Sequence, residues 1–236
     1  MKLLLCRGSP RQNIQEVEEL NPILPCDKLI CTFTPEFQAY KKMREYFLSK
    51  DYDYMVLATD DIVVRPEHII QLESDLIKNN YQVLSGLMNV DECDWNNPKG
   101  NINICTELAL KDKKLRNYYW FTYDTHPQQD ILQVKFSGFP LMAVRRDIIE
   151  KYEFAGDAIF KGKGMEFGAS LDFVFCWYCH ENNIPIFVDK RISMQHLRNH
   201  GKMRIGESSP KLWFWPQGKE IERIPNNFSF NSDVLV

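Results

Sequence analysis

The sequence predicts an α/β fold in a single domain, with a mostly parallel central sheet, helices on both faces and a small antiparallel addition. Between residues 2 and 88, short apolar runs alternate with segments of helical spacing in the order βαβαβ, which is typical of parallel sheets. The run Tyr54–Ala58 is apolar throughout, as expected of a central strand covered on both faces. The length of 236 residues fits one large domain.

The chain begins with a predicted strand over Lys2–Cys6, which leads into a polar turn over residues 7–13. A second strand is predicted over Asp27–Phe33. Pro35 then begins a helix, because its fixed φ suits the first helical position. The apolar residues of this helix share one face: Phe37, Tyr40, Met43, Phe47 and Leu48.

Two adjacent acids, Asp60 and Asp61, follow the strand Tyr54–Ala58. A helix is predicted over Pro66–Asn79 and a further strand over Tyr81–Met88. Acids at the carboxyl end of a parallel strand lie where open α/β sheets bind ligands. Because adjacent carboxylates repel each other unless a cation or hydrogen-bond donors compensate, the pair predicts a binding site.

The regular alternation ends after residue 88. Residues 89–133 are rich in turn formers and aromatics, which predicts insertions with short antiparallel strands. Val134–Val144 predicts a strand interrupted at Ser137-Gly138, followed by a short helix over Arg146–Lys151. A glycine inside a strand often marks a bulge or the close approach of a ligand to the backbone.

The last predicted elements are a helix over Ser170–Asn182 and a strand over Ile184–Val188. The helix carries Cys176 and Cys179, which match a haem-attachment pattern but are interpreted as small packing residues of an amphipathic helix. Residues 198–236 form a polar, aromatic-bearing tail with no strong period.

Composition excludes several classes of protein. The net charge of −3 and the pI near 6.0 give no sign of a nucleic-acid-binding protein. No apolar run approaches the roughly 20 residues of a transmembrane segment, and the apolar part of the amino terminus is too short for a secretory signal. Seven cysteines without a framework spacing favour free thiols. We therefore expect a cytoplasmic protein.

Four motifs, in order, resemble those of the GT-A fold glycosyltransferases, specifically the inverting family-2-like transferases that use nucleotide sugars. The acid-tipped strand Ala58–Ile62 resembles the family's DxD motif, and Ser137–Arg146 resembles its glycine-containing strand. Ser170–Phe175 is similar to the start of the helix that supplies the catalytic base, and Ile184–His196 to the closing strand that ends in a metal-binding histidine. The resemblance spans roughly residues 27–200.

The resemblance implies a Rossmann-like GT-A domain that transfers a sugar from a nucleotide-diphosphate-sugar donor to an acceptor hydroxyl, with inversion. It implies Asp172 as the general base and Asp61 and His196 as ligands of Mn²⁺ or Mg²⁺, with His200 a rival ligand. The residues that it implies in substrate binding are Thr32, Phe33, Thr59, Asp60, Gly138, Phe139 and Arg198.

Two positions depart from the family pattern. Thr59 stands where the family has the first acid of its DxD motif, and a hydroxyl does not ligate a metal as a carboxylate does. Leu171 stands where the family has an acid before the base. The first departure makes Asp61 the expected metal ligand, with Asp60 contacting the nucleotide.

The resemblance divides the chain into a catalytic domain over residues 1–200 and a tail over residues 201–236 that packs on or near the active site. The nucleotide-binding part covers about residues 1–90, and the acceptor part about residues 91–200. Two alternatives remain open. A nucleotidyltransferase of related fold would also use strand-end acids, and the loop Arg7–Arg11 partly matches its basic, glycine-containing loop. A non-catalytic nucleotide- or glycan-binding module would keep the pocket without the base.

Overall fold

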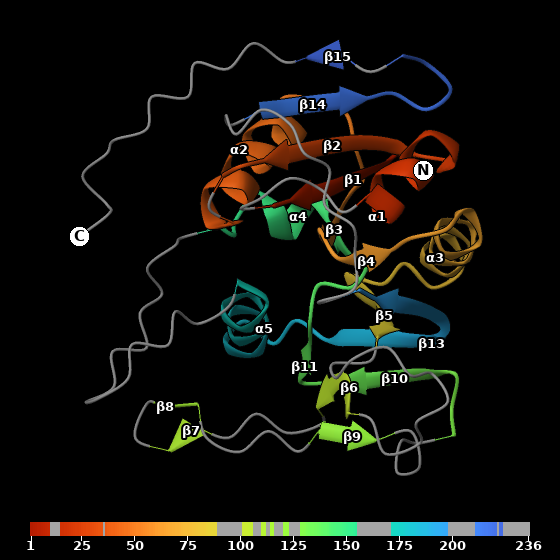
Figure 1. Cartoon of the computed structure of the whole chain (residues 1–236). Helices are drawn as coiled ribbons and strands as arrows, with labels where there is room; N and C mark the ends of the chain where they lie inside the picture. Colours follow the sequence, from red (N-terminus) through yellow and green to blue (C-terminus); the bar gives the residue numbers. More distant parts are fainter. Residues whose placement is uncertain are drawn as a thin grey trace.

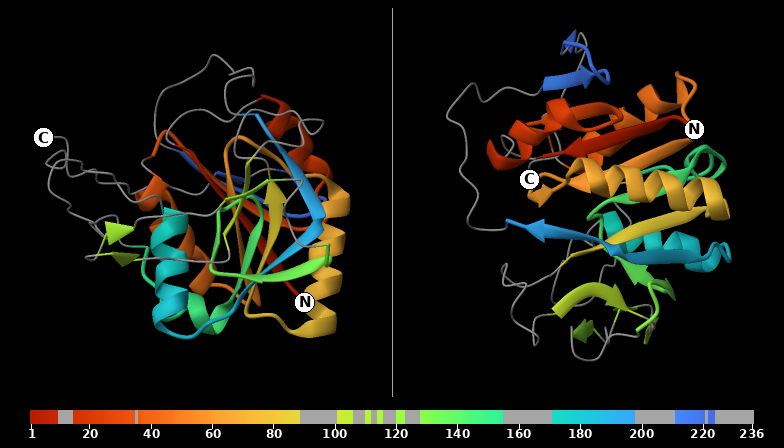
Figure 2. Two further views of the ribbon diagram at one scale, coloured as in Figure 1. Left: turned by 90° about the horizontal axis from the view of Figure 1, so that it is seen from below. Right: turned by 90° about the vertical axis from the view of Figure 1, so that its right-hand side faces the viewer.

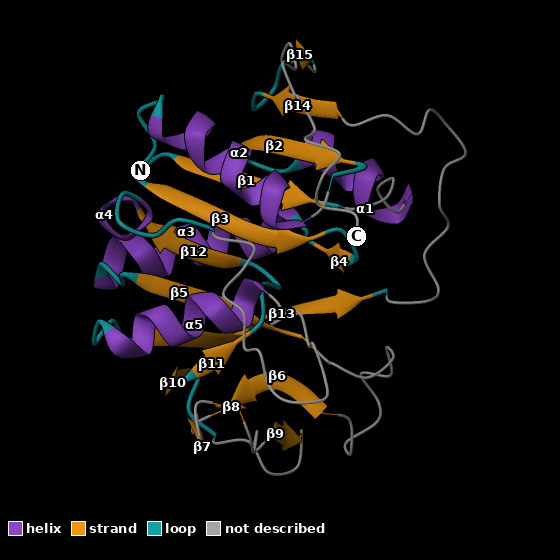
Figure 3. Cartoon of the chain, turned by 90° about the vertical axis from the view of Figure 1, so that its left-hand side faces the viewer, coloured by secondary structure: helices purple, strands orange, loops and turns teal. Residues whose placement is uncertain are grey.

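The computed structural model describes residues 1–9, 15–34, 36–88, 101–105, 110–111, 114–115, 120–122, 128–154, 171–197, 211–220 and 222–223. Within these residues, a large mixed sheet lies between two layers of helices (Figure 1). The helices are α1 (Gln15–Leu20), α2 (Glu36–Leu48), α3 (Pro66–Asn79), α4 (Arg146–Ile149) and α5 (Leu171–Glu181), with a short 3-10 helix over Asn21–Ile23. Figure 3 shows α2 and α5 in front of the strands, and the right view of Figure 2 shows α3 against the opposite face.

The sheet has the order β10-β13-β5-β12-β3-β1-β2-β14-β15. Five of its strands run in one direction: β1 (Leu3–Gly8), β2 (Asp27–Thr32), β3 (Tyr54–Thr59), β5 (Val83–Met88) and β13 (Ile186–His196). Four others are antiparallel to their neighbours: β10 (Ile131–Val134), β12 (Met142–Arg145), β14 (Lys211–Trp215) and β15 (Glu222–Arg223). The predicted parallel strands are therefore present, with β12 inserted between β3 and β5.

Alternation of side chains along each central strand builds two cores. Leu4 and Cys6 of β1 pack with the apolar faces of α2 and α5, whereas Leu3 and Leu5 pack with the apolar face of α3. Successive residues of a strand point to opposite faces, so an unbroken apolar run is what two covered faces require. The continuous apolar strands in the sequence follow directly from this three-layer arrangement.

The interruption predicted at Ser137-Gly138 in the strand over Val134–Val144 is present, but the segment also divides between two sheets. The structure divides this segment into β10, β11 (Phe136–Ser137) and β12, and β11 leaves the main sheet to pair with β6 (Asn101–Cys105). Apolar alternation shows that residues are extended, but it does not specify which strand they pair with. The segment therefore resembles one strand while serving two sheets.

Short antiparallel strands predicted within residues 89–133 are confirmed where the structure describes them. β6 pairs with β9 (Trp120–Thr122), and β7 (Leu110–Lys111) pairs with β8 (Lys114–Leu115).

β13 is longer than the strand predicted over Ile184–Val188 from its apolar run, and it reaches His196 as the family resemblance implies. β13 continues through the charged residues after Val188 as far as His196, and its end pairs with β4 (Ile62–Val63), a two-residue strand that was not predicted. Charges in the middle of the segment hid its continuation, because sequence patterns treat a charged run as a loop.

The predicted irregular tail contains β14, which pairs antiparallel with β2 along its whole length. Its sequence, Lys-Leu-Trp-Phe-Trp, has β-compatible residues but no alternation of polar and apolar types, so the period-2 signal is absent.

Five cysteines are described with their side chains, and all are buried and free: Cys6, Cys26, Cys31, Cys176 and Cys179. This confirms the predicted free thiols for these five and the packing role of Cys176 and Cys179 in α5. In the described part of the chain, no helix has the length and apolar character needed to cross a membrane.

Candidate functional site

The carboxyl ends of β1, β2 and β3 lie side by side, because the strands are parallel and in register. Gly8 at the end of β1 is opposite both Cys31 and Thr59. The residues that follow these strands therefore meet at one edge of the sheet, where ligands bind in open α/β folds.

Asp60 lies in a turn that is fixed by the end of β1. The Ser9 hydroxyl donates a hydrogen bond of 2.6 Å to Asp60 Oδ2, and the Ser9 backbone N–H donates to the Cys31 carbonyl at 2.8 Å. Both Ser9 and Asp60 are buried. Asp60 therefore has one carboxylate oxygen engaged by the protein itself.

The two predicted metal ligands are brought together although 135 residues separate them. His196 Nε2 lies 3.1 Å from Asp61 Oδ2, and the two side chains are only 8% and 15% exposed. The Leu197 N–H donates to the Asp61 carbonyl at 2.8 Å, which attaches the end of β13 to the acidic turn. The Thr59 hydroxyl donates to Asp61 Oδ1 at 2.8 Å, so Thr59 orients the carboxylate.

Arg7 holds the turn that contains Asp60 and Asp61, and it was not predicted as a site residue. Its side chain is 1% exposed, and Nη1 donates to the carbonyls of Thr59 at 2.6 Å and Ile62 at 3.0 Å. Burial lowers the pKa of Arg7 to about 10, although Tyr40, Asp60 and Asp61 act in the opposite direction. The sequence signal that could have identified Arg7 is its guanidinium in an otherwise apolar strand.

Glu36 is a second site residue that sequence reasoning missed. It begins α2, directly after the end of β2. Burial raises the pKa of Glu36 to about 7, and the charges of Asp172, Asp60 and Asp61 add to this effect. Three carboxyl groups from two other parts of the chain are therefore close enough to act on Glu36. Only the order of β1, β2 and β3 in space reveals that these carboxyl groups are close to Glu36. No local sequence pattern could have predicted it.

Replacing Glu36 with Gln is expected to stabilise the protein at neutral pH and to change little at pH 4. The folded-state pKa of about 7 lies above the ordinary value of 4.5, so folding disfavours the ionised form. The wild-type free energy of unfolding should thus fall as pH rises from about 4.5 to about 7, by at most about 3 kcal/mol. Urea unfolding at pH 4, 6 and 8 measures this.

The matched control for this prediction is Glu45→Gln, which removes a half-exposed acid from the same helix. Parallel stability curves for wild type and Glu36→Gln between pH 4 and 8 would contradict the prediction.

Asp172 lies in the first turn of α5, where the predicted base was placed. Its Oδ1 accepts a hydrogen bond of 2.8 Å from the Phe173 N–H. A helix amino terminus favours the ionised carboxylate. Its effect on Glu36 shows that Asp172 lies within electrostatic range of the acidic edge.

Thr32 ends β2 beside the site, and Phe33 follows it. The Thr32 carbonyl accepts a hydrogen bond of 3.1 Å from the Thr34 hydroxyl, and Thr34 N–H donates to the Ser9 carbonyl at 3.2 Å. Phe33 has a φ of 53°, a left-handed conformation that is uncommon for a non-glycine residue. This tight turn directs the chain from β2 into α2.

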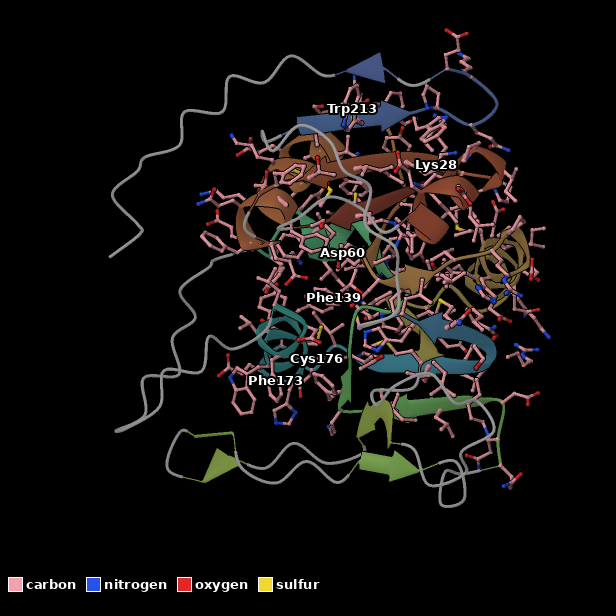
Figure 4. All side chains as sticks on the ribbon, in the orientation of Figure 1. Lys28, Asp60, Phe139, Phe173, Cys176 and Trp213 are labelled. Atoms are coloured by element: carbon pink, nitrogen blue, oxygen red, sulfur yellow. The ribbon has the colours of Figure 1, made fainter. Side chains whose placement is uncertain are left out.

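Gly138 and Phe139 lie in the connection between β11 and β12. The Phe139 ring is buried against the rings of Tyr40 and Phe175, at centroid distances of 5.8 and 6.0 Å. Its carbonyl accepts a hydrogen bond from the Thr59 N–H at 3.2 Å. Figure 4 labels Phe139 between Asp60 and α5. Phe139 thus holds the end of β3 in place through its backbone, while its ring belongs to the core.

Arg198, His200 and residues 10–13 of the predicted polar turn lie outside the described residues. Among the described residues, no group of three or more His, Cys, Asp or Glu is arranged to hold a metal ion. Of the residues predicted as metal ligands, the described ones are Asp61 and His196, and they lie together.

No protein-family model matches the sequence, and the comparison with curated proteins finds no match. Solved structures do match. The crystal structure of A197 from STIV has a TM-score of 0.50 at 13% sequence identity, covering 96% of this chain and 100% of that chain. The structure of CMP:2-keto-3-deoxy-manno-octonic acid synthetase complexed with CTP matches with a TM-score of 0.43 at 10% sequence identity, covering 80% of this chain and 90% of that chain.

The structural similarity shows the fold. The chain is a single α/β domain with a mixed central sheet and flanking helices, and it resembles the GT-A fold. This confirms the fold class predicted from the sequence. Nucleotide-sugar-utilising enzymes share the GT-A-like fold, but a fold hosts many reactions and does not define one.

Proposed function

We propose that this protein is a metal-dependent glycosyltransferase of the cytoplasm. It transfers a sugar from a nucleotide-diphosphate-sugar donor to an acceptor hydroxyl, with inversion at the anomeric carbon. The observation that carries the proposal is the meeting of Asp61 and His196, 3.1 Å apart, at the carboxyl edge of the parallel strands.

The Asp61–His196 pair fits a hard divalent cation. Two ligands at right angles on a Mg²⁺ ion, each roughly 2.1 Å from it, lie about 3.0 Å apart. The separation of Asp61 Oδ2 and His196 Nε2 is 3.1 Å. A carboxylate and an imidazole also suit Mn²⁺, and such ions keep waters and donor phosphate oxygens as their other ligands. A bound Mn²⁺ or Mg²⁺ would supply positive charge against the departing diphosphate.

The proposed roles of the other residues follow from their positions. Asp172 accepts the proton of the acceptor hydroxyl, since a carboxylate at a helix amino terminus stays ionised. Asp60, Thr32 and Phe33 surround the donor at the ends of β1 to β3. Thr59 orients Asp61, and Gly138 and Phe139 form the floor of the site. For Arg198, which lies outside the described residues, the family resemblance supports contact with the diphosphate.

A thermal-shift screen of UDP-, GDP- and CMP-sugars, with and without Mn²⁺, tests the proposal. A ligand at about 100-fold its Kd stabilises the folded protein by about 2.7 kcal/mol. We expect one nucleotide class to raise the Tm, and only with Mn²⁺ present. A shift with free CTP or UTP, and none with any nucleotide sugar, would favour a nucleotidyltransferase instead. No shift with any nucleotide would remove the donor from the proposal.

A further inference from the structure

A second group of charged side chains lies away from the acidic edge, between β13 and α3. Arg191 Nη2 donates to both carboxylate oxygens of Asp75 at 3.0 Å and to Asp189 Oδ2 at 2.9 Å, and its Nε donates to Asp189 Oδ1 at 2.9 Å. Asp189 is fully buried and Asp75 nearly so, whereas the Arg191 side chain is 43% exposed. We call Asp75, Asp189 and Arg191 the arginine clamp.

The clamp spans an irregularity in β13. Val188 is opposite Ser85 of β5, but the next paired residue, Ser193, is opposite Leu87. Four residues, 189–192, therefore lie against the single residue Gly86. A bulge of this kind interrupts the ladder of backbone hydrogen bonds and bends the strand.

Gly86 shows how closely the bulge packs on β5. A Cβ added at Gly86 would lie 2.7 Å from the Ile192 carbonyl oxygen and 2.4 Å from Met194 Cε. The methionine end could move aside, but the backbone oxygen could not without shifting the bulge. The bulge is thus held on one side by Gly86 and on the other by the arginine clamp, through Asp75 of α3.

The bulge decides where the end of β13 lies. After Ser193 and Met194, the strand leaves β5 and pairs with β4 through Gln195 and His196. This pairing places His196 Nε2 against Asp61 and the Leu197 N–H on the Asp61 carbonyl. We propose that the arginine clamp and Gly86 are positioning residues, which fix the bulge so that His196 stands opposite Asp61.

The energetic reason for a clamp is that residues 189–192 of the bulge lie outside the register that pairs β13 with β5. Lys190 N–H donates to the Asp130 carbonyl, and Arg191 N–H donates to the Asp189 side chain. Burial raises the pKa of Asp189, and the hydrogen bond from Arg191 acts in the opposite direction. Gln71 Nε2 donates to Asp75 at 2.8 Å and keeps the other carboxylate in place.

Arg191→Gln tests the clamp, and Arg145→Gln is the matched control. Arg145 makes an equivalent two-bond contact with Asp147, but at the end of β12 and the start of α4. Hydrogen exchange of the Leu197 amide is the readout, with amides of the β1–β3 ladder as an internal reference for global opening. We expect Leu197 exchange to accelerate about 10-fold or more relative to the reference in Arg191→Gln, and to be unchanged in Arg145→Gln.

If Arg191→Gln does not fold, Arg191→Lys takes its place. Leu197 amide exchange is then expected to accelerate by less than the roughly 10-fold expected for Arg191→Gln. Gly86→Ala disturbs the bulge from the other side with the clamp intact, and the same acceleration is expected. Unchanged relative exchange of Leu197 in the Arg191 and Gly86 variants would overturn the proposal.

The effect on metal binding rests on the proposed function, whereas the placement of His196 does not. Titration with Mn²⁺ alone, followed by electron paramagnetic resonance, should show weaker binding in Arg191→Gln than in Arg145→Gln. If wild type binds no Mn²⁺, the proposed function fails, and the exchange experiment still decides the clamp.

Discussion

Replacing Asp172 with Asn is expected to abolish most sugar transfer while leaving donor binding unchanged. Asn keeps the size of the side chain and can still accept the Phe173 N–H bond through its carbonyl, but it takes no proton from an acceptor hydroxyl. Loss of a positioned base typically lowers kcat by about 10²–10⁴-fold. Donor binding is measured by calorimetry, and transfer by release of the nucleoside diphosphate.

The control for this prediction is Asp147→Asn, which changes a first-turn acid on α4 that is held by Arg145. It should leave transfer unchanged. Full transfer by Asp172→Asn would rule out Asp172 as the base, and loss of donor binding together with transfer would show that Asp172 contacts the donor.

Replacing Asp61 with Asn should remove the Mn²⁺ dependence of nucleotide-sugar binding. The variant keeps the Thr59 and His196 neighbours and removes the charge that a hard cation needs. We expect the thermal shift seen with Mn²⁺ and a nucleotide sugar to disappear, and Mn²⁺ affinity to fall by at least about 10-fold.

Asp51→Asn is the control for the metal prediction, because it removes an exposed acid from the other end of the sheet. Its Mn²⁺ binding should equal that of wild type. Persistence of the Mn²⁺-dependent shift in Asp61→Asn would show that the cation is held elsewhere in the chain.

The sequence carried enough information for the elements around the site. Helical spacing and an initial proline defined α3 to the residue, and the unbroken apolar run of β3 placed Asp60 and Asp61 at a strand end. These signals are local, because periodicity and capping depend on neighbours within a few residues. The approach of His196 to Asp61 came from the family resemblance, since no local pattern relates residues so far apart.

The remainder depends on contacts that are distant in sequence. Arg7 was assigned to a turn, because a charge usually ends an apolar strand, and its two carbonyl partners on the β3–β4 turn are more than 50 residues away. Glu36 resembles an ordinary first-turn acid until the strand order places it beside three others. The bulge in β13 could not be predicted either, since the roles of Gly86 and Arg191 become apparent only once the pairing of β13 with β5 is known.

The reactivity of the buried thiols can report when the native protein opens locally. The thiolate is the reactive form of cysteine, and burial raises the pKa of Cys26 to about 12 and that of Cys31 above its ordinary value. Cys26 packs in the core on the α3 side of the sheet, and Cys31 in the core on the α2 and α5 side. Alkylation rates at these two positions would therefore time the exposure of each layer separately, without any introduced label.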